Sequence, residues 1–353
     1  MSTSINAAHQ QQSLPATLRC IDKWFETKDC VSILLSAENP SPFKFKPGQF
    51  VTIGVEVEGK AEYRAYSISS LPNEQSLQLT IKRVDGGKVS NYMVDHLTIG
   101  DSLECLPVAG EFNNIDYPPQ SIDGQKKVLL ISAGCGITPV FSMARSWLAQ
   151  SDGVDICFLH IARNIEQTIY FEQLEKMHQQ EQMFDLKLLL KDAQSSGYPQ
   201  GRLTAELLET LVPDFATRTV YLCGPSQFML DVVSYLERLD FDMANFHQES
   251  FTPTESETIE DTSASSDSVS IELPAFGQNL QVSKGTVLAD ALEQGGVPII
   301  IACRSGICGS CKCKVKVGQV ESSNHSPLSE EEIAQGYVLA CSSTIESNVT
   351  IEL

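Results

Sequence analysis

The chain has 353 residues, which is long for a single core and predicts two or three domains. Its formal net charge of −20 argues against binding to nucleic acids or to an anionic membrane, because both need a cationic surface. No apolar run approaches the roughly 20 residues of a membrane span. Residues 1–14 are polar and rich in Gln, without the basic start and apolar run of a secretory signal. We expect a disordered tail there and a cytoplasmic protein.

Residues 15–118 are predicted to form a small antiparallel barrel. Pro-Gly, Asp-Gly-Gly and Ile-Gly-Asp turns separate four runs with the composition of strands. These runs are 31–35, 49–57, 77–82 and 101–106. Several short strands at this spacing are typical of a barrel. One helix is expected, at 89–96.

Residues 124–251 alternate between apolar strands and amphipathic helices. The predicted strands are 128–131, 156–162, 186–190 and 219–222. The predicted helices are 138–149, 171–179, 204–211 and 226–239. This βαβ rhythm predicts an open parallel α/β sheet, the architecture of many nucleotide-binding domains.

The remaining chain divides into a linker and a third domain. Residues 252–268 are rich in Ser and Thr and carry five acids and no base, which is typical of a solvated linker. Residues 269–353 are predicted to form a compact mixed α/β domain, with a helix at 286–294 and a second one that Ser329 and Glu332 cap as a capping box.

Five of the eleven cysteines lie in this third domain. An odd number of clustered cysteines favours a metal site over disulfides. Cys303, Cys308 and Cys311 form C-x4-C-x2-C, and Cys341 follows at a distance, which is the spacing of plant-type [2Fe–2S] ferredoxins. The alternatives are a structural zinc site or a redox thiol pair. Zinc usually takes two C-x2-C pairs, and these four cysteines contain one.

Glycines and lysines surround the cysteine motif. Gly306 and Gly309 would let the loop wrap closely, since glycine accepts positive φ. Residues 312–317, with the sequence KCKVKV, alternate between lysines on one face and Cys313 with the valines on the other. Cys313 is therefore predicted to be a core residue and not a fifth ligand. The opposite face carries three lysines, which either protect an edge strand or form a basic patch that steers an acidic acceptor. The patch consists of Arg304, Lys312, Lys314 and Lys316.

Four short motifs in the first two domains suit the binding of phosphate-bearing cofactors. Residues 64–69, with the sequence RAYSIS, follow a predicted strand, and residues 86–91, with the sequence GGKVSN, open a helix whose glycine turn and serine suit an anion. Residues 134–139, with the sequence GCGITP, lie between a strand and a helix, as phosphate binding requires. A simple βα turn is the alternative, but residues 223–225, with the sequence CGP, make a second such turn.

Together these motifs resemble the ferredoxin–NADP reductase-like flavoproteins. Residues 269–353 resemble the β-grasp fold of plant-type ferredoxins. The order of the domains, with the ferredoxin domain last, resembles oxygenase-type reductases. The resemblance implies that Arg64 pairs with the flavin pyrophosphate, that Tyr66 stacks on the isoalloxazine ring, and that Ser67 hydrogen-bonds near flavin N5. The residues that it assigns to the flavin are Arg64, Tyr66, Ser67, Ile68, Ile81, Lys82, Gly87, Val89 and Ser90. Those that it assigns to the nicotinamide dinucleotide and the closing segment are Gly134, Gly136, Thr138, Pro139, Cys223, Gly224, Pro225, Glu249 and Phe251.

Over most of its length the chain is similar to the NADH oxidoreductases of the hybrid-cluster protein. This similarity implies electron flow from NADH through FAD and [2Fe–2S] to a protein acceptor, with the hybrid-cluster protein expected. The alternatives are the reductase component of a Rieske-type or other multicomponent oxygenase, and a redox sensor without turnover. The preference for NADH over NADPH, and for FAD over FMN, rests on resemblance. No side chain is expected to transfer protons as a catalyst, because the cofactors carry the chemistry.

Overall fold

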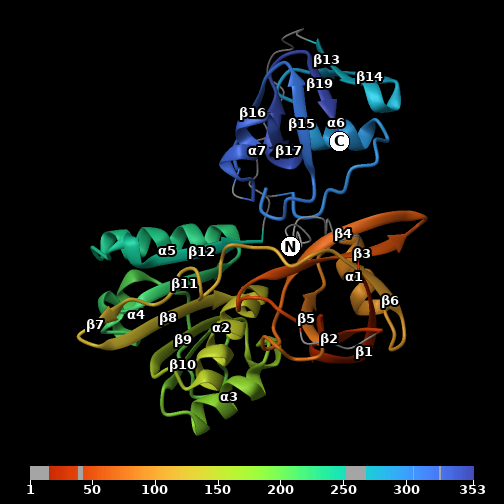
Figure 1. Ribbon diagram of the computed structural model, residues 1–353. Coiled ribbons are helices and arrows are strands. Elements are labelled where there is room, and N and C mark those ends of the chain that lie inside the picture. Colours follow the sequence, from red (N-terminus) through yellow and green to blue (C-terminus); the bar gives the residue numbers. More distant parts are fainter. Residues whose placement is uncertain (1–15, 39–42, 252–267, 305, 326) are drawn as a thin grey trace, which may run out of the picture.

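The computed structural model describes residues 16–38, 43–251, 268–304, 306–325 and 327–353. Figure 1 shows three packed units, an orange barrel, a yellow and green α/β unit, and a blue C-terminal unit above them. The predicted N-terminal tail and nearly all of the predicted acidic linker lie outside the described residues, and Ser268, at the end of that linker, begins a strand. No helix in these ranges is long and apolar enough to cross a bilayer.

The first unit is a six-stranded antiparallel barrel with strand order β4-β3-β6-β1-β2-β5. An antiparallel bridge between Ile68 and Leu79 joins its two edges. Its strands are β1 (Ala16–Thr27), β2 (Cys30–Ala37), β3 (Phe50–Val57), β4 (Lys60–Ser67), β5 (Leu77–Lys82) and β6 (Ser102–Cys105), and its helix is α1 (Lys88–Asp95). The four predicted strands are present, and β1 and β4 are additional. The flavin motif therefore begins within β4 instead of following a strand, because Arg64 pairs with Ile53 of β3.

The second unit is a parallel sheet with strand order β10-β9-β8-β11-β12, as predicted from the βαβ rhythm. Helices α2 and α3 pack on one face of the sheet, and α4 and α5 pack on the other. The strands are β8 (Gln125–Ala133), β9 (Val154–Ala162), β10 (Phe184–Leu190), β11 (Thr219–Gly224) and β12 (Phe246–Ser250), with a short β7 (Ser121–Ile122) paired to β8. The helices are α2 (Ile137–Gln150), α3 (Phe171–Gln180), α4 (Ala205–Leu211) and α5 (Ser226–Arg238). The strand order reverses between β8 and β11, which is where such sheets bind ligands.

The third unit is a mixed sheet with strand order β14-β13-β19-β15-β17, crossed by α6. The capping box of Ser329 and Glu332 is present at the start of α7. The strands are β13 (Ser268–Leu273), β14 (Gln278–Ser283), β15 (Lys312–Val317), β17 (Tyr337–Leu339) and β19 (Val349–Glu352), with β16 (Val320–Ser322) and β18 (Ser343–Ile345) paired apart. The helices are α6 (Leu288–Gln294) and α7 (Glu330–Ala334). Single 3-10 turns lie at Gly134–Gly136, Ile165–Gln167, Phe215–Thr217, Met243–Asn245, Pro274–Phe276 and Ala340–Ser342.

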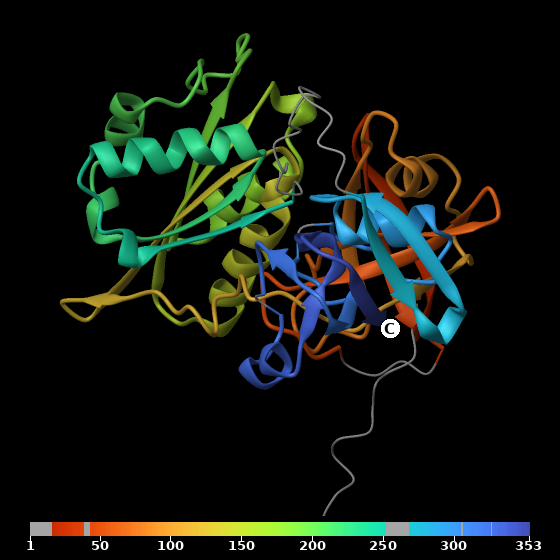
Figure 2. The same ribbon diagram turned by 90° about the horizontal axis from the view of Figure 1, so that it is seen from above.

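Polar contacts join the barrel to the α/β unit. Arg145 of α2 donates from Nη1 to the carbonyl oxygen of Ser69 at 2.8 Å. Tyr170, at the start of α3, donates its hydroxyl hydrogen to Ser69 Oγ at 2.9 Å. Seen from above, the blue unit lies in front of the junction between the other two (Figure 2). The strand ends at the switch point, the barrel and the cysteine loop therefore meet in one region.

Candidate cofactor and cluster site

A cavity of about 570 Å³ lies where the three units meet. The barrel supplies one side of it, the switch point between β8 and β11 supplies another, and the cysteine loop completes it. Twelve of the residues predicted to bind cofactors line this cavity: Arg64, Tyr66, Ser67, Lys82, Gly87, Val89, Ser90, Gly136, Thr138, Gly224, Pro225 and Phe251. Residues that the sequence did not single out for the flavin or the nucleotide also line it, among them Thr80, Ala133 and Ala302.

Six predicted residues do not line this cavity. Ile68 and Ile81 are fully buried in the barrel core. Gly134 opens the glycine turn, Pro139 is buried in the first turn of α2, and Cys223 is buried at the end of β11. Glu249 lines a neighbouring cavity of about 70 Å³.

Arg64 is a cation on the cavity wall, and no carboxylate of the described residues forms an ion pair with it. Its Nη1 donates to the carbonyl oxygen of Tyr63 at 2.6 Å. The other cations on the wall each have carboxylate partners, namely Lys82 with Asp29, Arg83 with Asp95, Lys88 with Glu62, and Arg304 with Asp290 and Glu293. A guanidinium with spare donors suits a phosphate or pyrophosphate group.

Tyr66 and Ser67 place two buried hydroxyls at the same cavity. Neither Tyr66 OH nor Ser67 Oγ has a hydrogen-bond partner among the described residues. Burial raises the pKa of the Tyr66 hydroxyl, so it stays neutral and can donate. Buried polar groups are normally satisfied, so these two hydroxyls indicate a polar ligand at this end of the cavity and fit a flavin.

The start of α1 lies on the cavity wall beside these groups. Gly87 is the N-cap of α1, and a Cβ placed there would lie 2.5 Å from Ser90 Oγ. Ser90 Oγ accepts a hydrogen bond from the Val84 backbone at 3.3 Å, so the hydroxyl faces the preceding turn. Free backbone N–H groups at a helix start suit an anion.

The two turns at the switch point pack directly on each other. A Cβ on Gly136 would lie 2.2 Å from the carbonyl oxygen of Cys223, so only glycine fits there. Gly134 has a φ of +54°, and α2 begins at Ile137, which puts Pro139 in the first helical turn. The turn GCGITP and the turn CGP therefore form one surface facing the cavity.

Glu249 of β12 lies between the barrel and the cysteine loop. The small cavity that it lines also contacts Ser67, Phe251 and Cys303. Its side chain is buried, and its Oε2 atom has no partner among the described residues. Burial raises the pKa of this carboxyl to about 8, so it is largely protonated near neutral pH.

The four cysteines of the predicted cluster converge. The thiol of Cys303 is within hydrogen-bonding contact of Cys308 and Cys341, and Cys341 also contacts Cys311. The backbone N–H of Cys341 donates to Cys311 Sγ at 3.4 Å. Four converging thiols, three of them from one loop, suit a [2Fe–2S] cluster.

The surroundings of the cluster loop agree with the predicted strand faces. Cys313 is 1% exposed and packs in the core of the third unit. Lys312 pairs with Glu332 at 2.8 Å and Lys316 with Glu352 at 2.6 Å, so most of the predicted basic patch is neutralised. Lys314 lies over the Tyr337 ring, 5.0 Å from its centroid.

Comparison with known proteins identifies the three units. Family models match an oxidoreductase FAD-binding domain at residues 21–114, an oxidoreductase NAD-binding domain at 130–234 and a 2Fe-2S iron-sulfur cluster binding domain at 274–346. The chain is 36% identical over 352 residues to the glycine betaine monooxygenase reductase subunit of Pseudomonas aeruginosa, covering 95% of this chain and 94% of that protein. It is 34% identical over 319 residues to the NADH oxidoreductase HCR of Escherichia coli, covering 90% and 91%.

A solved structure shares the complete fold. Phthalate dioxygenase reductase matches with a TM-score of 0.63 and 23% identity, over 96% of this chain and 98% of that one. The predicted three-unit architecture and the predicted cofactors FAD, NAD and [2Fe–2S] are confirmed by these matches. The chain belongs to the family of iron–sulfur flavoprotein reductases, oxidoreductases that pass electrons from a nicotinamide dinucleotide through FAD to a [2Fe–2S] cluster.

Proposed function

We propose that this reductase delivers its electrons to the oxygenase component of a multicomponent oxygenase. The sequence alone favoured the hybrid-cluster protein as acceptor. The glycine betaine monooxygenase reductase subunit, however, has the higher identity and the greater coverage, and the fold is also that of phthalate dioxygenase reductase. These relatives support the oxygenase alternative over the first expectation.

One observation carries the proposed electron path. The flavin motif, the switch-point turns and Cys303 all line the same cavity, so hydride donor, flavin and cluster would meet without any movement of the cysteine loop. When bound, FAD accepts a hydride and releases electrons singly, which no side chain does. The protein groups bind and orient the cofactors.

Each part of the cavity has a proposed role. Arg64 would hold the pyrophosphate of FAD, Tyr66 and Ser67 would contact its ring, and the start of α1 would bind phosphate. The surface made by Gly136 and Gly224 would bind NADH. The four cysteines, Cys303, Cys308, Cys311 and Cys341, would ligate the cluster.

The acceptor is tested with purified partners. The holoprotein is mixed with NADH and either a glycine betaine monooxygenase oxygenase component or a hybrid-cluster protein, with ferricyanide as an acceptor that needs no docking. We expect saturable NADH oxidation with the oxygenase component and a much weaker response to the hybrid-cluster protein. The reverse preference, with ferricyanide reduction intact, would return the assignment to the hybrid-cluster protein.

A further inference from the structure

A line of hydrogen-bonded side chains runs from the cofactor cavity through the barrel wall. Thr80 of β5 lines the cavity, and its Oγ1 lies 2.7 Å from Ser32 Oγ of β2. Ser32 in turn donates to Glu26 Oε1 of β1 at 2.6 Å. Thr80 and Ser32 are buried, whereas Glu26 is partly exposed. The line therefore connects the cavity to a carboxylate at the outside of the barrel.

The hydroxyls along this line can share their hydrogens in more than one arrangement. Thr80 Oγ1 also lies 2.5 Å from the hydroxyl of Tyr170, which donates its hydrogen to Ser69. With Ser32 donating to Glu26, the single hydrogen of Thr80 can serve only one of its two neighbours, Ser32 or Tyr170. Hydroxyls in such a chain can pass a proton along by turning.

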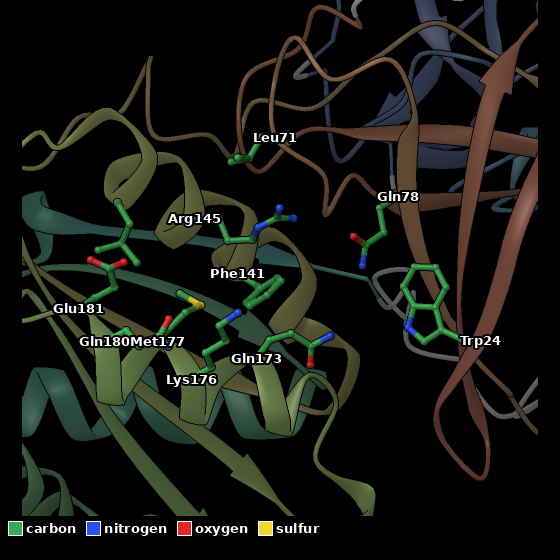
Figure 3. A pocket seen from close by; sticks show the side chains of 11 residues that line it. Trp24, Leu71, Gln78, Phe141, Arg145, Gln173, Lys176, Met177, Gln180 and Glu181 are labelled. Atoms are coloured by element: carbon green, nitrogen blue, oxygen red, sulfur yellow. The ribbon is translucent and has the colours of Figure 1, made fainter.

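The outer end of the line lies beside a second cavity. The indole Nε1 of Trp24 donates to the same Glu26 Oε1 at 2.7 Å, and Trp24 lines a cavity of about 370 Å³ between the barrel and the α/β unit. Figure 3 shows Trp24 on the barrel side, facing Phe141 and Lys176 on the helices across the cavity. Glu26 itself is partly exposed, so the outer end of the line is open to solvent.

The reaction leaves a proton that has to reach solvent. Oxidation of NADH balances as NADH → NAD⁺ + H⁺ + 2 e⁻, and the cluster accepts the electrons alone, so each turnover leaves one proton at the flavin site. No carboxylate or imidazole of the described residues lines the cofactor cavity. We propose that Thr80, Ser32 and Glu26 conduct this proton from the cofactor cavity to the solvent-accessible side of the barrel at Glu26.

The test measures proton release and flavin absorbance in the same reaction. FAD- and cluster-loaded protein reacts with one equivalent of NADH and two of ferricyanide in weak buffer with a pH indicator dye. In the wild type, the proton should appear together with flavin reoxidation. Ser32→Ala interrupts the line of hydroxyls. Glu26→Gln keeps the size and shape of this partly exposed side chain and removes its carboxyl group. Each should delay the proton about tenfold relative to the flavin signal.

Two control variants remove comparable groups outside the line. Ser142→Ala removes a buried hydroxyl that donates to the carbonyl oxygen of Ser70 across the same domain junction. Glu104→Gln changes a barrel carboxylate that accepts from the hydroxyl of Tyr63. Both should release the proton at the wild-type rate. The flavin midpoint potential should be unchanged in Ser32→Ala and Glu26→Gln, since a conducting path alters rates and leaves the equilibrium alone.

The outcomes are distinct. If the proton keeps pace with the flavin signal in both Ser32→Ala and Glu26→Gln, the path is wrong. If the midpoint potential shifts in these variants while proton release stays prompt, the hydroxyls tune the flavin and do not conduct. The use of ferricyanide makes the result independent of which protein is the natural acceptor.

Discussion

Glu249 is a buried carboxyl whose protonation is coupled to folding. Burial raises its pKa to about 8 from an ordinary value of 4.5. The folded chain therefore holds this proton more tightly than the unfolded chain does. The resulting stability is fully present below pH 4.5 and is lost as the pH rises toward 8.

Replacing Glu249 by Gln removes this dependence. The free energy of unfolding of Glu249→Gln, minus that of the wild type, should grow between pH 5 and pH 8 by up to about 4 kcal/mol, at about 1.36 kcal/mol per pKa unit. Urea unfolding of the FAD-free protein at several pH values measures this difference. The exposed Glu209→Gln serves as the control and should follow the wild type. A pH-independent difference for Glu249→Gln would show that Glu249 is ionised in the folded protein.

Cys341 and Cys313 give a matched pair of cysteine substitutions. Cys341 contacts the thiols of Cys303 and Cys311, whereas Cys313 packs in the core of the third unit. Cys341→Ser should lose the visible absorbance of the cluster and keep NADH reduction of the flavin. Cys313→Ala should keep the cluster and lose on the order of 1 kcal/mol of stability from the removed sulfur. A wild-type cluster spectrum in Cys341→Ser would reject the ligand assignment.

At the scale of elements, the cysteine loop depends on two left-handed glycines. Gly306 has a φ of +74° and Gly309 a φ of +72°, so alanine at either position costs about 1–2 kcal/mol. A Cβ on Gly306 would in addition lie 3.0 Å from the Cβ of Ser342, the neighbour of Cys341. At Gly309 the nearest atom would be 3.7 Å away, on Pro327.

This difference predicts unequal loss of the cluster. Gly306→Ala should lower the iron and sulfide content of the purified protein more than Gly309→Ala does, because only the first substitution pushes on the 3-10 turn that carries Cys341. Iron and acid-labile sulfide assays, with flavin content as the internal reference, measure it. Equal losses in the two variants would mean that backbone strain alone sets cluster retention.

At the scale of the whole molecule, a net charge of −20 would repel an acidic acceptor unless a local cation attracts it. Lys312 and Lys316 are neutralised by Glu332 and Glu352, which leaves Lys314 without a carboxylate partner among the described residues. The acceptor surface is therefore expected to depend on Lys314 more than on its two neighbours.

Lys314→Glu should slow electron transfer to the natural acceptor severalfold at low ionic strength. The effect should fade above roughly 0.1 M salt, where the screening length is about 10 Å. NADH-to-ferricyanide activity should be unchanged, and Lys126→Glu, an exposed lysine of the α/β unit, is the control. Equal rates with the natural acceptor at low salt would make Lys314 an ordinary surface residue.

The amino-acid sequence by itself determined the features that depend on neighbouring residues. The cysteine spacing predicted the iron–sulfur domain because three of the four cysteines lie close together in the chain. Ser329 and Glu332 predicted the start of α7 because a capping box also joins residues that are near in sequence. The βαβ rhythm predicted the parallel sheet because each buried strand and amphipathic helix has its own period. The motifs at 64–67 and 134–138 are likewise runs of neighbouring residues, so they could be found in the sequence without the fold.

The tertiary structure alone decided what depends on contacts between distant segments. The sequence did not predict strands β1 and β4, because most of their residues are exposed or half-buried and give no clear apolar alternation. Closure of the barrel stabilises these two strands. The fit of Gly136 against Cys223 joins residues from two different strands. The line from Thr80 through Ser32 to Glu26 crosses three strands, and no spacing in the sequence encodes it. Such contacts exist only after the sheets close, because hydrogen-bond geometry between distant residues is set by packing.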